Sequence, residues 1–263
     1  MDRRLWIAAV LLLGMACAEE KGTAGVKLGI VCTTGMIGDF VGVIAGDVAE
    51  VVTLMGPGVD PHDYSASKAD VELLSGADII FYNGLFLEGQ LQDILERMAH
   101  TRKVVAVSRD IPVDLLRRPP EYAGEHDPHI WFDVSLWKEA VGPVVATLSE
   151  LRPDLYGEFK VRGEAYRARI DTLHHWVSDR IRSVPEGRRV QVTAHDAFGY
   201  YGDAYGIEVI GLHGDSSIPE HGLTDATVVG PFYSDALGAA GSGADTYVRM
   251  VEFNTRAIVG ALR

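Results

Sequence analysis

Two patterns of apolar and polar residues alternate along the chain. Short apolar runs, typical of buried strands, are separated by segments whose apolar residues recur every three or four positions, as on one face of a helix. In the first half, strand-like runs lie at 26–33, 50–55, 77–82 and 103–107, and helical segments at 36–45, 67–74, 87–100 and 134–151. Strands that alternate with helices predict βαβ units and a parallel sheet.

A longer apolar stripe follows Pro153, which can sit early in a helix. Its members recur at three- and four-residue steps, or at seven across Arg162: Leu155, Phe159, Tyr166, Ile170, Leu173, Val177 and Ile181. This spacing predicts one helix of about 28 residues, roughly 40 Å long at 1.5 Å per residue. The alternative is two helices with a kink at Gly163, because glycine weakens a helix interior.

The rest of the chain returns to the alternating pattern and then becomes irregular. Strand-like runs at 189–193 and 207–212 flank a short helical segment at 197–205. A short strand-like run at 232–235 leads into a loop, and an amphipathic helix is expected at 246–262. The fold class is therefore α/β, with mainly parallel sheets flanked by helices.

Charge narrows the range of partners. The 263 residues carry a formal net charge of −13. An acidic surface argues against a nucleic-acid partner, which would need a basic stripe. The excess negative charge would attract cations in general, although it is also explained by solubility alone.

The first seventeen residues have the layout of a signal peptide. Arg3 and Arg4 precede an apolar run at 5–15, and Ala16 precedes Cys17. Such a run is too short to span a bilayer comfortably. A small residue before a cysteine also ends bacterial lipoprotein signals, which predicts lipid attachment at Cys17. Gly14 stands where such signals usually carry leucine, so a cleaved soluble form and an uncleaved anchor remain alternatives.

The second cysteine is not expected to form a disulfide. Cys32 lies in an apolar stretch, where a free cysteine behaves as a small buried hydrophobe. Lipid attachment would remove Cys17 from disulfide chemistry, although an extracytoplasmic compartment would permit a bond.

Three histidines and one aspartate share a placement. His62, His129 and His195 each lie just after an apolar run, and Asp235 follows the short run at 232–235. Ligand-binding residues gather at the carboxyl ends of strands in open α/β sheets. Three imidazoles and one carboxylate make a tetrahedral set for Zn²⁺, and the same atoms can bind Mn²⁺. Binding needs neutral imidazoles, so affinity should fall steeply below about pH 6.

Spacing alone does not settle this assignment, because the intervals between the four residues match no compact metal motif. His126 is an alternative accessory ligand or a solvated loop residue, and His213 and His221 are further candidates. Asp196 either orients His195 through a hydrogen bond or caps the following helix.

Four motifs in order resemble the TroA-like zinc- and manganese-binding proteins of bacterial ABC importers. The matching segments are Gly56-Pro57-Gly58-Val59-Asp60-Pro61-His62, Asp127-Pro128-His129-Ile130-Trp131-Phe132-Asp133, Thr193-Ala194-His195-Asp196-Ala197-Phe198-Gly199-Tyr200 and Tyr233-Ser234-Asp235-Ala236-Leu237-Gly238. Thr246-Tyr247 and Asn254 also fit the closing helix of that family.

This resemblance implies two lobes joined by one long helix, with the metal held between them. The expected divisions are a signal at 1–17, a first lobe at 18–152, a connecting helix at 153–184 and a second lobe at 185–263. The first lobe would supply His62 and His129, and the second His195 and Asp235. The implied function is capture of Zn²⁺, or Mn²⁺ as the alternative, by a monomer in the periplasm or on the outer face of the cytoplasmic membrane. The cargo would pass to an ABC permease, without enzymatic activity.

One region departs from the family pattern. Between His213 and Phe232 the chain has about forty residues fewer than that pattern, which predicts a thinner second lobe. Asp235 then becomes a conditional ligand, because a central strand that would help to deliver it is missing. A sequence or gene-model defect would also explain the gap. A zinc hydrolase with an open coordination position, or a non-transporting surface protein, are the competing functions.

Overall fold

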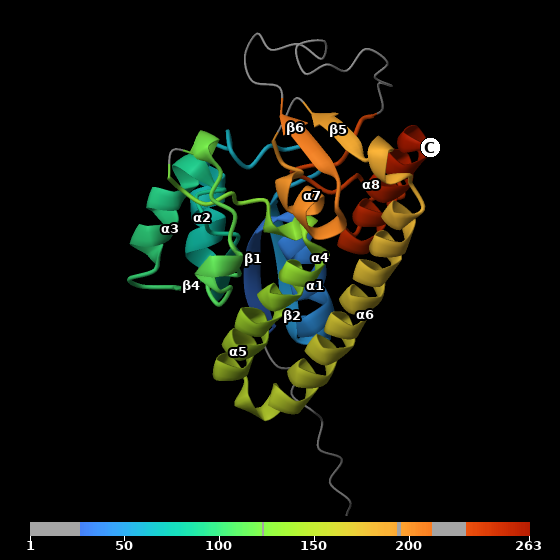
Figure 1. Ribbon diagram of the computed structural model, residues 1–263. Helices are drawn as coiled ribbons and strands as arrows, with labels where there is room; N and C mark the ends of the chain where they lie inside the picture. Colours follow the sequence, from blue (N-terminus) through green and yellow to red (C-terminus); the bar gives the residue numbers. More distant parts are fainter. Residues whose placement is uncertain (1–26, 123, 194–195, 212–229) are drawn as a thin grey trace, which may run out of the picture.

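Two parallel sheets organise the computed structural model, which describes residues 27–122, 124–193, 196–211 and 230–263 (Figure 1). The first sheet has the order β2-β1-β3-β4, and the second pairs β5 with β6. The strands of the first sheet are β1 (Leu28–Thr34), β2 (Ala49–Met55), β3 (Ile79–Tyr82) and β4 (Lys103–Ala106), and those of the second are β5 (Val190–Thr193) and β6 (Glu208–Gly211). All pairings are parallel, so the predicted fold class is confirmed.

Helices cover both faces of the first sheet. Along β1, Ile30 and Cys32 belong to the main core, whereas Val31 belongs to a second cluster with Leu74 and Leu95. This alternation follows from the two-residue repeat of a strand. Helices α2 (Lys68–Gly76) and α3 (Gln92–Met98) cover one face, and α1 (Gly35–Ala45) covers the other. Cys32 is buried and free, as expected.

Helix boundaries follow local signals in the sequence. The Ser67 hydroxyl accepts from Asp70 N, and the Asp70 carboxylate accepts from Ser67 N, which forms a capping box. The segment predicted as one helix at 134–151 is instead divided into α4 (Val134–Trp137), a 3-10 turn and α5 (Val141–Leu151). Pro143 explains the division, because it has no N–H to donate to the carbonyl of Glu139.

The long apolar stripe forms a single helix, α6 (Tyr156–Arg182), so the alternative of two helices is wrong. It runs along one side of the molecule, from the end that carries α5 to the end that carries β5 and β6 (Figure 1). Gly163 lies in its interior, where a Cβ would come within 2.7 Å of the Val145 side chain. The glycine therefore serves close packing between α5 and α6 rather than a kink.

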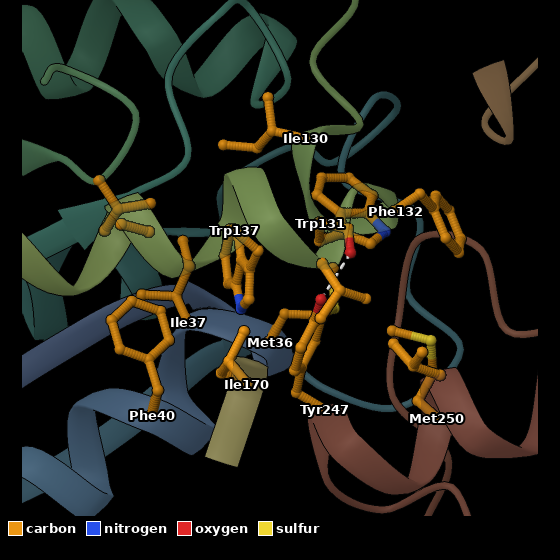
Figure 2. Close-up of a cluster of buried hydrophobic side chains, with 14 of the residues drawn as sticks. Met36, Ile37, Phe40, Ile130, Trp131, Phe132, Trp137, Ile170, Tyr247 and Met250 are labelled. Atoms are coloured by element: carbon orange, nitrogen blue, oxygen red, sulfur yellow. Dashed lines mark hydrogen bonds between the residues drawn. The ribbon is translucent and has the colours of Figure 1, made fainter. Parts of the chain in front are cut away.

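The main core continues from α1 across α6 to α8 (Tyr247–Leu262). Figure 2 shows its centre, where the Tyr247 hydroxyl donates to the carbonyl of Trp131 at 2.7 Å. Trp137 packs against Phe40 and Tyr247 at centroid distances of 5.4 and 5.5 Å. The closing helix is thus built into the core beside the first sheet.

The structure corrects the prediction of a short strand at 232–235, because these residues pair with no strand among the described residues. An amide side chain takes the place of a strand partner: Asn254 Oδ1 accepts from Tyr233 N at 3.1 Å, and Asn254 Nδ2 donates to Tyr233 O at 2.7 Å. The shortened region that sequence analysis predicts falls largely on residues 212–229, outside the described residues. Across the described part of the chain, no helix is long and apolar enough to cross a membrane.

Candidate metal centre

Two Asp-Pro-His turns place the first two histidines. In each turn the aspartate carboxylate accepts from the backbone N–H of the histidine two residues later. The distances are 2.8 Å from His62 N to Asp60 Oδ1 and 3.0 Å from His129 N to Asp127 Oδ1. Such Asx turns fix the backbone locally, so both imidazoles leave the chain from a defined position.

The two imidazoles meet one carboxylate. His62 Nε2 and His129 Nε2 lie 3.1 Å apart, and Asp235 Oδ1 lies 3.8 Å from the former and 3.4 Å from the latter. Ligands at about 2.0–2.1 Å from a tetrahedral zinc ion are separated by about 3.4 Å from one another. The three atoms therefore have the spacing of donors that share one ion. The site is shielded on one side, because His129 is 0% exposed, Asp235 12% and His62 29%.

Asp127 also binds the His129 ring. Its Oδ1 lies 2.7 Å from His129 Nδ1 and is buried with it. A carboxylate at Nδ1 favours the tautomer with its proton on that nitrogen, which leaves the Nε2 lone pair directed at His62 and Asp235. The turn therefore orients the ring as well as the backbone. Asp60 contacts the backbone N–H of His62 in its turn.

The carboxylates also govern the protonation of His129. Burial alone would lower the pKa of this imidazole, but Asp127 and Asp235 outweigh burial and raise the pKa to about 9. In the absence of a cation, both ring nitrogens therefore hold a proton at neutral pH. A metal ion would replace the proton on Nε2, beside Asp235, while Nδ1–H stays paired with Asp127.

The buried carboxyl group of Glu88 holds the loop that contacts both histidine turns. Glu88 accepts from Thr33 Oγ1 at 2.8 Å and from Asn83 N at 2.6 Å, and burial raises its pKa to about 7. Asn83 Nδ2 in turn donates to the carbonyl of Pro128 at 3.0 Å. Gly89, at φ +44°, leaves room for the carbonyl of His62, which would lie 2.7 Å from a Cβ. The loop after β3 therefore positions both histidine turns.

Asp235 is held by its sequence neighbours. The Trp131 indole N–H donates to the carbonyl of Ser234 at 2.9 Å, and Asn254 of α8 holds the backbone of Tyr233 on both sides. An open pocket of about 350 Å³ borders this segment and is lined by residues 57–60 and 232–239. Asp235 is thus fixed from α8 and from the segment after His129, and the pocket opens beside it.

The structure brings together three of the four predicted ligands. His62, His129 and Asp235 form a group able to hold one ion, whereas His195 lies outside the described residues. His126 does not join this group, and its Nδ1 lies 3.3 Å from the carbonyl of Arg117. The candidates His213 and His221 also fall outside the described residues.

Sequence reasoning assigned no role to Asp127, Glu88 or Tyr122. The Tyr122 hydroxyl lies 3.4 Å from His129 Nδ1 and donates to the carbonyl of Asp196 at 3.2 Å. A signal existed for Asp127, because both histidine motifs carry aspartate two residues before the histidine. No comparable pattern marks Glu88 or Tyr122.

Parallel sheets with a partly buried cluster of two histidines and one carboxylate point to the class of two-lobed solute-binding proteins. Residues 30–225 match the family model of the zinc-uptake complex component A, periplasmic, and the chain belongs to this family. It is 40% identical to the zinc-binding protein TroA of Treponema pallidum over 308 positions, covering all of this chain and 99% of that one. It is also 33% identical to the manganese-binding lipoprotein MntA of Bacillus subtilis, with 97% and 96% covered.

The solved structures agree with the sequence relatives. The periplasmic zinc-binding protein TroA from Treponema pallidum superimposes with a TM-score of 0.83 at 38% identity, covering 90% of this chain and 99% of that chain. The predicted TroA-like family is thus confirmed. The alignment over 308 positions exceeds the 263 residues of this chain, so the relative has residues that this chain lacks.

Proposed function

We propose that the protein captures Zn²⁺, with Mn²⁺ as the alternative cargo, through His62, His129, His195 and Asp235. The observation that carries the proposal is the spacing of the three described donors, which fits one shared ion. His195 is assigned from the sequence, two residues after Thr193 at the end of β5. Three imidazoles suit zinc better than manganese, although relatives are named for either metal.

The bound metal ion is transferred to an ABC permease and does not serve a catalytic reaction. The family consists of metal-uptake components, and the B. subtilis relative is named a lipoprotein. We place the protein in the periplasm or on the outer face of the cytoplasmic membrane, attached as a monomer through lipidated Cys17. Replacement of Cys17 by alanine should move the protein from the membrane fraction to the soluble extract. Unchanged membrane attachment would refute the lipid anchor.

The lobes follow from the same proposal. The four-stranded sheet lies within residues 18–152, α6 within 153–184, and the two-stranded sheet within 185–263. This division supports a first lobe, a connecting helix and a second lobe. Because the main core runs from α1 to α8, we expect opening between the lobes to be small.

Titration calorimetry on metal-free protein from residue 18 onward tests the function. One Zn²⁺ per chain should bind with a dissociation constant well below micromolar, and Mn²⁺ more weakly. His62→Ala and His195→Ala should each weaken zinc binding strongly. His175→Ala is the matched control, because this exposed helix histidine is not part of the group. Absence of zinc and manganese binding tighter than micromolar would refute the function.

A further inference from the structure

Arg117 connects the histidine turn to α7 (Gly199–Tyr205). Its Nε donates to Asp203 Oδ2 of α7 at 2.7 Å, and its Nη1 donates to Asp127 Oδ2 at 2.8 Å. The guanidinium also lies 5.8 Å from the centre of the Tyr200 ring. A Cβ on Gly199 would come within 1.5 Å of Nη1, so only glycine leaves space for the guanidinium here.

The same contacts continue to the candidate metal ligand. Asp127 is fully buried, and its second oxygen, Oδ1, lies 2.7 Å from His129 Nδ1. Backbone contacts reinforce this path, because the Tyr200 hydroxyl accepts from Arg117 N and donates to Asp127 O, both at 3.0 Å. One carboxylate therefore joins the guanidinium on one side to the imidazole on the other.

The two ends of this path belong to segments that carry different ligands. Helix α7 begins four residues after His195, whereas Asp127 precedes His129 by two. We propose that Arg117 is a positioning residue that couples α7 to His129, so that release of the bound metal depends on this contact. The proposal rests on the metal-capture function above. Movement of α7 would then change the position of the His129 ring through Arg117 and Asp127.

The two arms of the contact differ in expected strength. Asp203 is 69% exposed, and an exposed ion pair contributes little, about 0–1 kcal/mol. Asp127 is buried, so removal of Arg117 would leave its charge without the guanidinium that faces it. Loss of Arg117 should therefore affect the metal much more than loss of Asp203, and both changes should act in the same direction.

Zinc dissociation measures this coupling directly. The zinc-loaded full-length mature chain is mixed with excess chelator in a stopped-flow instrument. Arg117→Gln should speed zinc release about 10- to 100-fold, the effect expected for loss of a group that orients a ligand. Asp203→Asn should speed release about two- to fivefold, as for an exposed pair. Arg152→Gln is the control, because it removes the exposed Arg152–Asp154 pair. It should leave the rate unchanged.

A second readout separates coupling from stability. In the wild type, zinc should slow amide hydrogen exchange in α7 as well as around His62 and His129. In Arg117→Gln, zinc should still slow exchange around the histidines but not in α7. The double variant Arg117→Gln/Asp203→Asn should release zinc no faster than Arg117→Gln alone, because Asp203 acts through Arg117.

Gly199→Ala approaches the same contact from α7. Its methyl group should displace the guanidinium and also speed zinc release. This variant therefore tests the proposal even if Arg117→Gln does not fold. Wild-type release rates and retained α7 protection in either folded variant would overturn the coupling. A wild-type chain that binds no zinc would instead refute the proposed function itself.

Discussion

The first and second sheets position their candidate ligands in different ways. Four strands with both faces covered support the turns of His62 and His129, and Glu88 and Asn83 tie the loop after β3 to these turns. The second sheet, in the described part of the chain, pairs only β5 with β6. Asp235 is nevertheless in place, because Asn254 and Trp131 hold its neighbours. The position of a ligand therefore depends on the hydrogen bonds that hold its neighbouring residues more than on the size of the adjacent sheet.

The largest effect should come from His129, the most buried donor. His129→Ala removes one ligand and leaves Asp127 buried without its imidazole partner. Zinc affinity should fall by more than the roughly 100-fold cost of losing an orienting partner. His62→Ala should cost less, because His62 is more exposed and water can replace it. Calorimetry of both variants checks this order, and equal losses would contradict it.

The two aspartates of the histidine turns form a matched pair. Asparagine can preserve the turn at both positions, but it has no negative charge to pair with an imidazole N–H. Asp127→Asn should weaken zinc binding about 10- to 100-fold, because the ring loses its carboxylate partner. Asp60→Asn should change affinity by less than about threefold, because asparagine can keep the hydrogen bond from His62 N that forms the turn. Competition with a fluorescent zinc chelator measures both, and a larger effect of Asp60→Asn would refute the distinction.

Asn254 tests whether Asp235 depends on α8. Asn254→Ala removes both contacts to Tyr233 and should weaken zinc binding about tenfold, with a loss of roughly 1–3 kcal/mol in the free energy of unfolding. Thr255→Val is the control on the same helix, because it breaks the buried contact between Thr255 and the Tyr201 hydroxyl. It should destabilise the chain but leave zinc affinity unchanged. Similar losses of zinc affinity in both variants would show that destabilisation of α8, and not the contact between Asn254 and Tyr233, lowers the affinity.

The smallest effect concerns pH and contrasts the metal-free with the metal-bound protein. The pKa of His129 in the folded protein is raised to about 9, above its ordinary value of 6.5. Its protonated form therefore stabilises the metal-free fold fully below pH 6.5, and this contribution is lost as the pH rises through about 9. Zinc affinity should rise over the same window, well above the pH of about 6 expected from an ordinary imidazole, because the metal displaces the proton.

Thermal unfolding between pH 6.5 and 9 measures the contrast. The melting temperature should fall by at least about 2 °C in the metal-free protein, and metal-free His129→Gln should lose this dependence. The zinc-dependent increase in melting temperature should grow over the same range. A metal-free protein whose melting temperature rises with pH in step with the zinc complex would contradict the assignment.

Much of the fold follows from the sequence. The apolar runs located both sheets, and the stripe from Leu155 to Ile181 located α6 within a few residues. The segment at 232–235 escaped this reasoning, because its backbone is paired by the side chain of Asn254, which is distant in the sequence. Periodicity also did not reveal the division between α4 and α5, which depends on the single missing N–H of Pro143.

The candidate site could be predicted only in part. His62, His129 and Asp235 were found because they follow strand-like runs in motifs that resemble a family. The groups that orient them were not found. Glu88 and Arg117 act through tertiary contacts that join distant segments, and no spacing in the sequence marks such contacts.

The proposed set of three imidazoles and one carboxylate is tested most directly by X-ray absorption at the zinc edge. The account predicts four nitrogen or oxygen ligands at about 2.0–2.1 Å, with scattering from three imidazoles. His195→Ala should reduce the imidazole count to two, and His175→Ala should leave it at three. A wild-type spectrum with two imidazoles, unchanged by His195→Ala, would contradict the proposed ligand set.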